Sequence, residues 1–202
     1  INFLVSEKSN SFITHNHAIQ NGGGGYLYNT QLTCDSDSTI TGNSAENEGG
    51  GLYINGSEGF LPNSIVSAKI NSNTALYGGG FSAGFSCTLG NNNYDNGNIL
   101  NGIEIYENSA EEGGGGVFLN TDNFIIQNCK IKDNESTLGC GIYSAKSFTF
   151  SSSILRDNKY KEDGYGNGIP YAILNKHYRN FINGVNVISN DENEDKEPME
   201  EL

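Results

Sequence analysis

One short pattern recurs six times along the chain and limits the folds that this sequence can adopt. The pattern has an apolar residue, two variable residues, an Asn and then a Gly-rich turn followed by apolar and aromatic residues. The copies begin at Ile13, Ile40, Ile70, Ile105, Ile131 and Leu155, and a seventh start at Val187 lacks the Gly turn. Because successive starts are 24 to 35 residues apart, the repeat fits a solenoid whose coils share strands and differ in their loops.

The Gly-rich turns decide between helical repeats and strand-based repeats. Most copies contain three or four consecutive Gly, and each Gly would cost about 1 kcal/mol inside a helix. Short runs rich in β-branched and aromatic residues, such as 124–126 and 148–150, are typical of strands. The sequence therefore predicts an all-β chain, folded as a single-stranded right-handed parallel β-helix of about seven coils.

The repeat also predicts which residues stack from coil to coil. Each strand should pair with its equivalent about 4.8 Å away in the next coil, so the apolar first residues of the pattern are expected to form an inward ladder. The Ala found two positions past the Asn in several copies is expected to line a tight interior corner. We expect the Asn side chains to bond coil to coil at a bend, with Asn itself in the left-handed backbone conformation. The members of this structural Asn ladder are Asn16, Asn43, Asn73, Asn108, Asn134 and Asn158.

Length and composition fit this interpretation. The chain has 202 residues, which suits one domain. Its 27 Gly and 30 Asn indicate either disorder or a repeat of tight turns, and the 21 Phe and Tyr residues favour the repeat. We predict a parallel β-helix domain over residues 1–190 and an acidic tail or linker over residues 191–202. We also expect the chain to be part of a longer protein or assembly.

The charge of the chain argues against several kinds of partner. The net charge is −13, of which −6 lies in residues 191–202, and neither part contains a basic patch. Nucleic acids and anionic membranes attract basic surfaces, so neither is expected as a partner. Since no apolar run approaches the ~20 residues of a membrane-spanning helix, we expect no direct membrane span.

Residues that commonly bind metals form no recognisable site in the sequence. The four cysteines lack metal-ligand spacing, and the sequence leaves open whether they form disulfides or remain buried thiols. They are Cys34, Cys87, Cys129 and Cys140. His15 and His17 could share one face of a strand, but no third ligand is evident. We therefore predict neither a metal ion nor a cofactor.

The paired motif resembles the polymorphic outer-membrane-protein repeats of bacterial surface adhesins and some protist surface proteins. Those repeats combine FxxN-type with GGA[I/L/V]-type motifs, and this chain has IxxN with GGGLY, GGGF or GGGVF over roughly residues 12–190. The resemblance implies a β-helical protein that is secreted or located at the cell surface and acts in adhesion or coat formation.

Polysaccharide lyases and glycoside hydrolases also adopt pectin-lyase-like β-helices, and they generally need converging carboxylates. Asp35 and Asp37 could share one face of a strand, but their stretch is equally typical of a turn. The adjacent acidic pairs at 111–112 and 162–163 would point to opposite faces of a strand or lie in a loop. We predict no catalytic residues, and an enzyme of this fold is the alternative function.

One set of aromatic residues forms a candidate binding surface. Residues alternate after each Gly turn, so Tyr53, Phe118 and Tyr143 are expected to point outward if their preceding neighbours point inward. Such an exposed column could bind sugar faces or another protein, unless a long loop covers it. The insert 88–100, which contains Tyr94, is both the candidate cover and a candidate recognition loop.

The expected function is therefore that of a non-catalytic β-helix repeat module at the cell surface or outside the cell. It would act in adhesion, in binding a carbohydrate or protein ligand, or as a structural component of a coat or filament.

Overall fold

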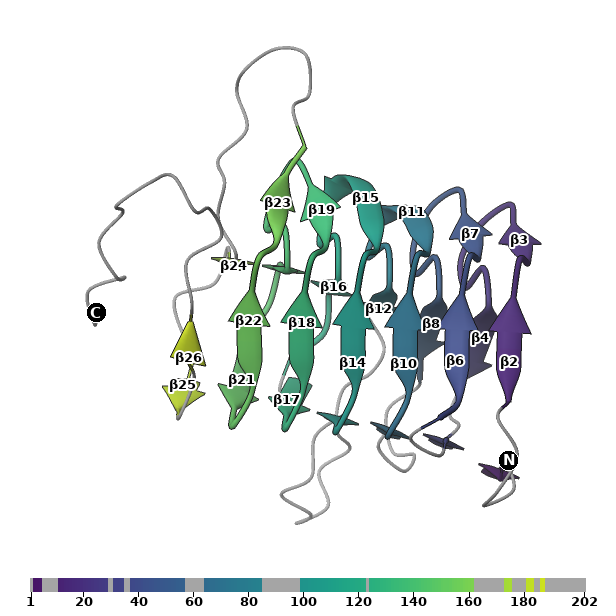
Figure 1. Cartoon of the computed structure of the whole chain (residues 1–202), viewed down its shortest axis with the longest axis horizontal. Coiled ribbons are helices and arrows are strands. Elements are labelled where there is room, and N and C mark those ends of the chain that lie inside the picture. The colour runs from purple at the N-terminus through teal and green to yellow at the C-terminus, as the bar shows by residue number, and fades with distance from the viewer. Residues whose placement is uncertain are drawn as a thin grey trace.

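The computed structural model describes ten stretches of the chain, which are residues 2–4, 11–28, 31–34, 37–56, 64–84, 99–122, 124–161, 173–175, 181–183 and 186–187. They form an all-β parallel β-solenoid of about four turns, and strands on both sides of these turns extend its sheets. Figure 1 shows the coils side by side along the long axis of the molecule, from purple β2 to yellow β26. Tyr94 and the acidic segment 191–202 lie outside the described residues.

Each coil contributes short strands to four parallel sheets. Sheet 1 contains β1 (Asn2–Leu4), β5 (Gln31–Thr33), β9 (Ser64–Val66), β13 (Ile99–Asn101), β17 (Phe124–Gln127), β21 (Phe148–Ser151) and β25 (Phe181–Asn183). Sheet 2 contains β2 (Phe12–Thr14), β6 (Thr39–Thr41), β10 (Lys69–Asn71), β14 (Glu104–Tyr106), β18 (Lys130–Lys132), β22 (Ile154–Arg156) and β26 (Asn186–Val187). Sheet 3 contains β3 (His17–Ala18), β7 (Ser44–Ala45), β11 (Thr74–Tyr77), β15 (Ser109–Gly113), β19 (Glu135–Ser136) and β23 (Lys159–Tyr160). Sheet 4 contains β4 (Gly25–Tyr28), β8 (Leu52–Asn55), β12 (Phe81–Ala83), β16 (Val117–Leu119), β20 (Ile142–Ser144) and β24 (Ile173–Asn175).

The core is a stack of apolar residues that repeat from coil to coil. The middle residues of β6, β10, β14, β18 and β22 point inward, and Ile70 pairs in register with Ile40 on one side and Ile105 on the other. These three side chains are at most 1% exposed, which confirms the predicted apolar ladder. Alternate residues of sheets 1 and 4, such as Phe124 and Leu119, complete the interior. Each fully buried side chain of this kind contributes about 1.5–3 kcal/mol to folding.

The six repeat asparagines lie in one hydrogen-bonded ladder at the bend between sheets 2 and 3. In the first five, Nδ2 donates to the Oδ1 of the Asn in the next coil at 2.9–3.0 Å, and the Nδ2 of Asn158 donates to the carbonyl oxygens of Ile131 and Arg156. The expectation that Asn itself adopts the left-handed backbone is wrong, because the preceding residue does so, as at Ser72 (φ 54°) and Asp133 (φ 54°). The left-handed turn one residue earlier leaves the Asn N–H directed along the ladder, so that the Asn73 N–H also donates to Asn108 Oδ1.

The Gly-rich turns allow backbones of neighbouring coils to stack closely. A Cβ added to Gly50 would lie 2.5 Å from the carbonyl oxygen of Gly79, and one added to Gly51 would lie 2.5 Å from that of Gly80. Real Cβ atoms essentially never approach backbone so closely, so any side chain would force the coils apart. Repeated Gly therefore fixes the tight corner that leads from sheet 3 to sheet 4.

Candidate functional site

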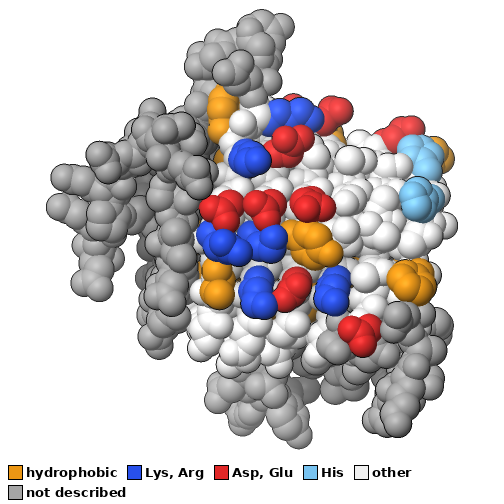
Figure 2. Space-filling view, in the orientation of Figure 1, with side chains coloured by type: hydrophobic (Ala, Val, Ile, Leu, Met, Phe, Trp, Pro, Cys, Tyr) orange, Lys and Arg blue, Asp and Glu red, His pale blue; other side chains and the backbone are white. Residues whose placement is uncertain are grey.

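The outer surface of sheet 2 carries charged side chains that recur from strand to strand. Because the middle residue of each strand points inward, the first and third residues point outward. Many of these outward residues are charged in β10, β14, β18 and β22. The bend residues that directly follow β14, β18 and β22 are charged as well. We call this surface the charged face, and its members are Lys69, Glu104, Tyr106, Glu107, Lys130, Lys132, Asp133, Arg156 and Asp157. Figure 2 shows the acidic and basic side chains gathered there in rows.

Opposite charges alternate on the charged face and pair with one another. Lys130 Nζ donates to Glu104 Oε1 at 2.7 Å across the β14–β18 ladder. Along the chain, Lys132 Nζ lies 2.6 Å from Asp133 Oδ2, and Lys132 also lies over the Tyr106 ring at 5.2 Å. Such exposed pairs stabilise the fold by only ~0–1 kcal/mol each. Their main effect is therefore to hold long side chains in a regular array.

The electrostatics of this array are clearest at Glu104. The hydrogen bond from Lys130 lowers the pKa of the Glu104 carboxyl below its ordinary value, with smaller contributions from the charges of Lys130, Lys69 and Lys132. Glu104 therefore presents a stable carboxylate on the surface, with ammonium groups on the strands at both sides.

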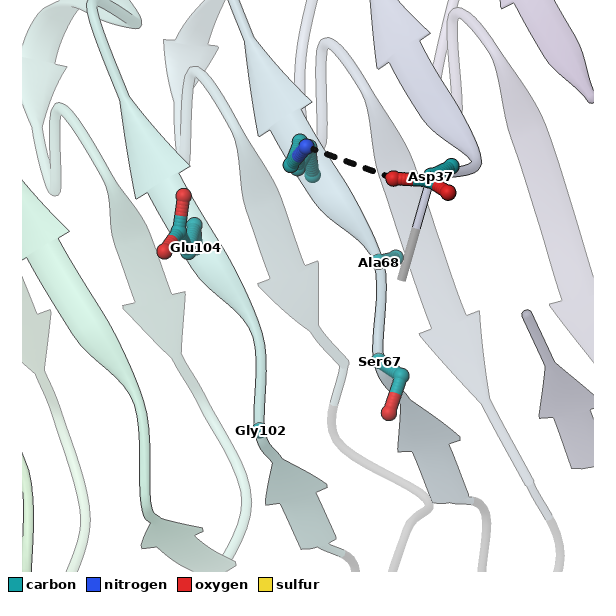
Figure 3. Close-up of a pocket in the computed structure, with 6 residues that line it drawn as sticks. Asp37, Ser67, Ala68, Gly102 and Glu104 are labelled. Carbon is teal, nitrogen blue, oxygen red and sulfur yellow. Dashed lines mark ion pairs between the residues drawn. The ribbon is translucent and has the colours of Figure 1, made fainter. Parts of the chain in front are cut away.

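A hollow of about 220 Å³ opens at the edge of the charged face, where sheet 1 turns into sheet 2. It is lined by Asp37, Ser67, Ala68, Lys69, Gly102 and Glu104. Figure 3 shows the carboxylates of Asp37 and Glu104 on either side of it. The Lys69 ammonium lies 3.9 Å from Asp37 Oδ1. The hollow is smaller than the ~300–1,000 Å³ typical of drug-sized ligand pockets, so it suits one polar unit of a longer ligand.

Gly102 explains why the hollow lies at this coil. Ser67, Asn128 and Ser152 stand at the same bend of other coils, and they share with Gly102 the left-handed backbone (φ 48–68°). A Cβ at Gly102 would have only Ser67 Oγ near it, at 3.7 Å. The missing side chain at Gly102 therefore leaves open a space that Asn or Ser occupies elsewhere in the column.

The aromatic residues predicted to form an exposed column are buried. Tyr53, Phe118 and Tyr143 point away from the apolar core, but only 6%, 7% and 6% of each is exposed. Phe118 and Tyr143 stack at 5.4 Å between ring centroids, and the Tyr77 ring packs on both at 5.0 and 6.4 Å. This part of the prediction is corrected, because the Tyr77 ring packs on Phe118 and Tyr143, and the Tyr26 ring packs on Tyr53 at 5.1 Å.

Tyr77 reaches these rings because of an irregularity between β11 and β15. The register shifts there, so that Tyr77 stands opposite Gly113. A Cβ on Gly113 would lie 2.8 Å from Tyr143 Cδ1, so Gly113 makes room for the Tyr143 ring. The candidate recognition residue Tyr94 and most of the insert 88–100 lie outside the described residues.

A half-buried carboxylate that the sequence analysis missed occupies a gap in the aromatic column. Ser82 stands in register between Tyr53 and Phe118, and its hydroxyl donates to Glu48 Oε2 at 2.7 Å. Burial raises the pKa of the Glu48 carboxyl, an effect that the Ser82 hydrogen bond partly opposes. The one signal in the sequence was a Ser at a position that is aromatic in four other coils.

The other candidate residues are dispersed. His17 Nδ1 lies 2.9 Å from Ser44 Oγ and its Nε2 lies 3.6 Å from Glu46, while the carboxylates of the 111–112 pair are exposed. Asp35 and the 162–163 pair lie outside the described residues. Within the described stretches, no group of three or more His, Cys, Asp or Glu side chains could hold a metal ion.

Cys34, Cys129 and Cys140 are buried and lie outside any disulfide. Burial raises the pKa of both Cys129 and Cys140 to about 11. The Cys129 thiol donates to the carbonyl oxygens of Gln127 and Leu100 at 3.1 and 3.3 Å. Cys87 lies outside the described residues.

Among the residues that the structure describes, we find no helix with the length and apolar character needed to cross a bilayer. Comparison of the chain with protein-family models, with curated proteins and with solved structures gave no match.

Proposed function

We propose that this chain is a non-catalytic repeat module, secreted or at the cell surface, that binds a carbohydrate or protein ligand and acts in adhesion or in a structural coat or filament. The resemblance of its repeat to polymorphic outer-membrane-protein repeats supports the location and the role. We also propose that the solenoid is a right-handed β-helix of about seven coils. Two sheets with seven strands each support the number of coils, and the right-handedness of ~98% of parallel crossovers supports the hand.

The observation that carries the proposal is the charged face with its hollow. Strands about 4.8 Å apart hold donors and acceptors in fixed rows, and ion pairs such as Lys130–Glu104 limit the motion of their side chains. A preorganised surface loses less conformational entropy on binding than a mobile one. Carboxylates and ammonium groups accept from and donate to hydroxyl groups, so an extended carbohydrate with one unit in the hollow suits this surface.

The experiment that tests the proposal incubates the folded chain with a panel of polysaccharides, with and without Ca²⁺, and measures both retention and released product. We expect retention without product. Gly102→Asn should fill the hollow and weaken retention about tenfold, equivalent to about 1.4 kcal/mol. Asn suits this backbone, because Asn128 has φ 53° in the same column.

Ser152→Asn is the matched control, since it places the same side chain in the same column but outside the hollow. Equal retention by both variants would contradict a site at Gly102. Product release that is lost in Asp37→Asn or Glu104→Gln would contradict the non-catalytic proposal and support a polysaccharide lyase or glycoside hydrolase. Absence of both retention and product would favour a protein ligand or a structural role.

A further inference from the structure

The end of strand β8 holds an Asn–Gly pair in an unusual arrangement. The Gly56 backbone N–H donates to the side-chain Oδ1 of Asn55, its own neighbour in the chain, at 2.9 Å. The Asn55 Nδ2 donates to the Tyr26 hydroxyl at 3.3 Å, and Asn55 is partly exposed to water. The Gly56 nitrogen is thereby held against the carboxamide of Asn55.

Two other Asn–Gly pairs in the described stretches are engaged differently. The Gly22 N–H donates to Glu48 O at 2.9 Å, and Asn21 Oδ1 accepts from Asn47 Nδ2 at 3.0 Å. These bonds direct both the nitrogen and the carboxamide of the pair toward the next coil.

The third pair repeats this protected arrangement. The Gly102 N–H donates to Gln127 O at 3.1 Å, and Asn101 Oδ1 accepts from Asn128 Nδ2 at 3.0 Å. In both protected pairs the Gly nitrogen points along the solenoid axis rather than toward the Asn side chain. The chain thus contains two internal controls for the pair at Asn55.

We propose that Asn55 is a site of spontaneous deamidation through a cyclic imide with Gly56. A base in solution removes the Gly56 amide proton, and the in-plane lone pair then points along the former N–H bond toward the Asn55 carboxamide. The nitrogen forms a bond to Asn55 Cγ, Nδ2 takes up a proton from the solvent, and the Cγ–Nδ2 bond breaks so that ammonia leaves. Water then opens the imide to Asp or iso-Asp. The reaction needs the nitrogen close to Asn55 Cγ, and the 2.9 Å hydrogen bond to Oδ1, the oxygen bonded to Cγ, holds the nitrogen beside the carboxamide.

The modification changes the surface at the end of β8. It replaces a neutral amide with a carboxylate and removes the bond that Asn55 Nδ2 donates to Tyr26. The iso-Asp product also lengthens the backbone by one methylene group at the point where the chain leaves sheet 4. A slow chemical change would therefore accumulate in the second coil as the protein ages.

The test ages the whole folded chain in mildly alkaline buffer and follows each Asn–Gly pair by peptide mapping with mass spectrometry. A parallel sample is aged in denaturant. We expect Asn55 to convert at least tenfold faster than Asn21 and Asn101 in the folded chain, and all three to convert at similar rates in denaturant. Gly56→Ala should slow conversion at Asn55 alone. The proposal is overturned if the rate at Asn55 relative to the two controls is the same in folded and denatured chains.

Discussion

Asn73 Nδ2 donates a buried hydrogen bond of 3.0 Å to Asn108 Oδ1, although the two residues are 35 positions apart in the sequence. The same Oδ1 also accepts from the Asn73 backbone N–H at 3.0 Å. One side-chain oxygen thus satisfies two donors of the preceding coil, both of which are shielded from water. This relationship joins coils through side chains in addition to the sheet ladders, and it makes the Asn ladder sensitive to single substitutions.

Asn108→Ala should destabilise the solenoid by about 3 kcal/mol, because it leaves buried donors at Asn73 without an acceptor. It also removes the bonds that Asn108 Nδ2 donates to Ile70 O and Asn134 Oδ1. Urea unfolding followed by circular dichroism gives the free energy of unfolding. Asn71→Ala is the control, since Asn71 is an outward residue of β10 whose side chain donates to its neighbour Ser72. An equal loss in both variants would contradict the role of the ladder.

Gly50→Ala should destabilise the fold by more than ~3 kcal/mol. The added Cβ would lie 2.5 Å from the carbonyl oxygen of Gly79, and backbone at that position cannot move without opening the stack. Gly25→Ala is the matched control, because its Cβ would meet only the flexible Cδ2 of Leu52, at 3.1 Å. The loss of stability in each variant is measured as the shift of its thermal unfolding midpoint from that of the wild type. A small shift for Gly50→Ala would show that the corner can relax.

The repeat predicts the ladders well because residues that recur at equivalent positions must stack when coils are parallel. Ile40 and Ile70 follow directly from this rule, and so do the partners of Asn73. Exposure could not be predicted in the same way. The alternation of inward and outward residues along a strand predicts that Phe118 points outward. It does not predict that Tyr77 lies across Phe118, since that contact depends on a register shift.

The hollow could not be predicted from the main pattern, since Gly102 lies outside it. A second signal was nevertheless present three positions before the apolar anchor of each coil. Ser67, Gly102, Asn128 and Ser152 occupy this position before Ile70, Ile105, Ile131 and Leu155. These are the small and polar residue types that tolerate a left-handed bend. A Gly in this column predicts that the surface differs at that coil. The depth of the resulting hollow, however, depends on neighbouring side chains such as Lys69.

The thiols of Cys129 and Cys140 should resist alkylation in the folded chain. With a pKa of about 11, only about one thiol in a thousand is ionised at pH 8, and the thiolate is the reactive form. Burial of both side chains further limits access. Iodoacetamide labelling followed by peptide mapping should show these two sites labelled at least a hundredfold more slowly than in denaturant. Rapid labelling of either site in the folded chain would indicate that its coil opens.

The stability of the solenoid should depend on the protonation of Glu48. Burial raises the folded-state pKa of this carboxyl above its ordinary value of 4.5, so the folded state favours the protonated form. The resulting stabilisation is complete below the unfolded-state pKa and is lost as the pH rises through the folded-state value. The free energy of unfolding of the wild-type chain should therefore fall, relative to that of Glu48→Gln, as the pH increases from about 4 to 7.

Glu48→Gln removes this dependence because an amide stays neutral over the whole range, and its nitrogen or oxygen can still bond to the Ser82 hydroxyl. Glu112→Gln is the control, since Glu112 is exposed. Urea unfolding at several pH values gives the difference between each variant and the wild type. If the difference for Glu48→Gln stays constant with pH, or if it grows toward acidic pH, the Glu48 carboxylate is better solvated than its place beside Ser82 implies. If the free energy of unfolding of Glu48→Gln rises relative to that of the wild type toward neutral pH, and that of Glu112→Gln does not, the Glu48 carboxylate is the source of the pH dependence.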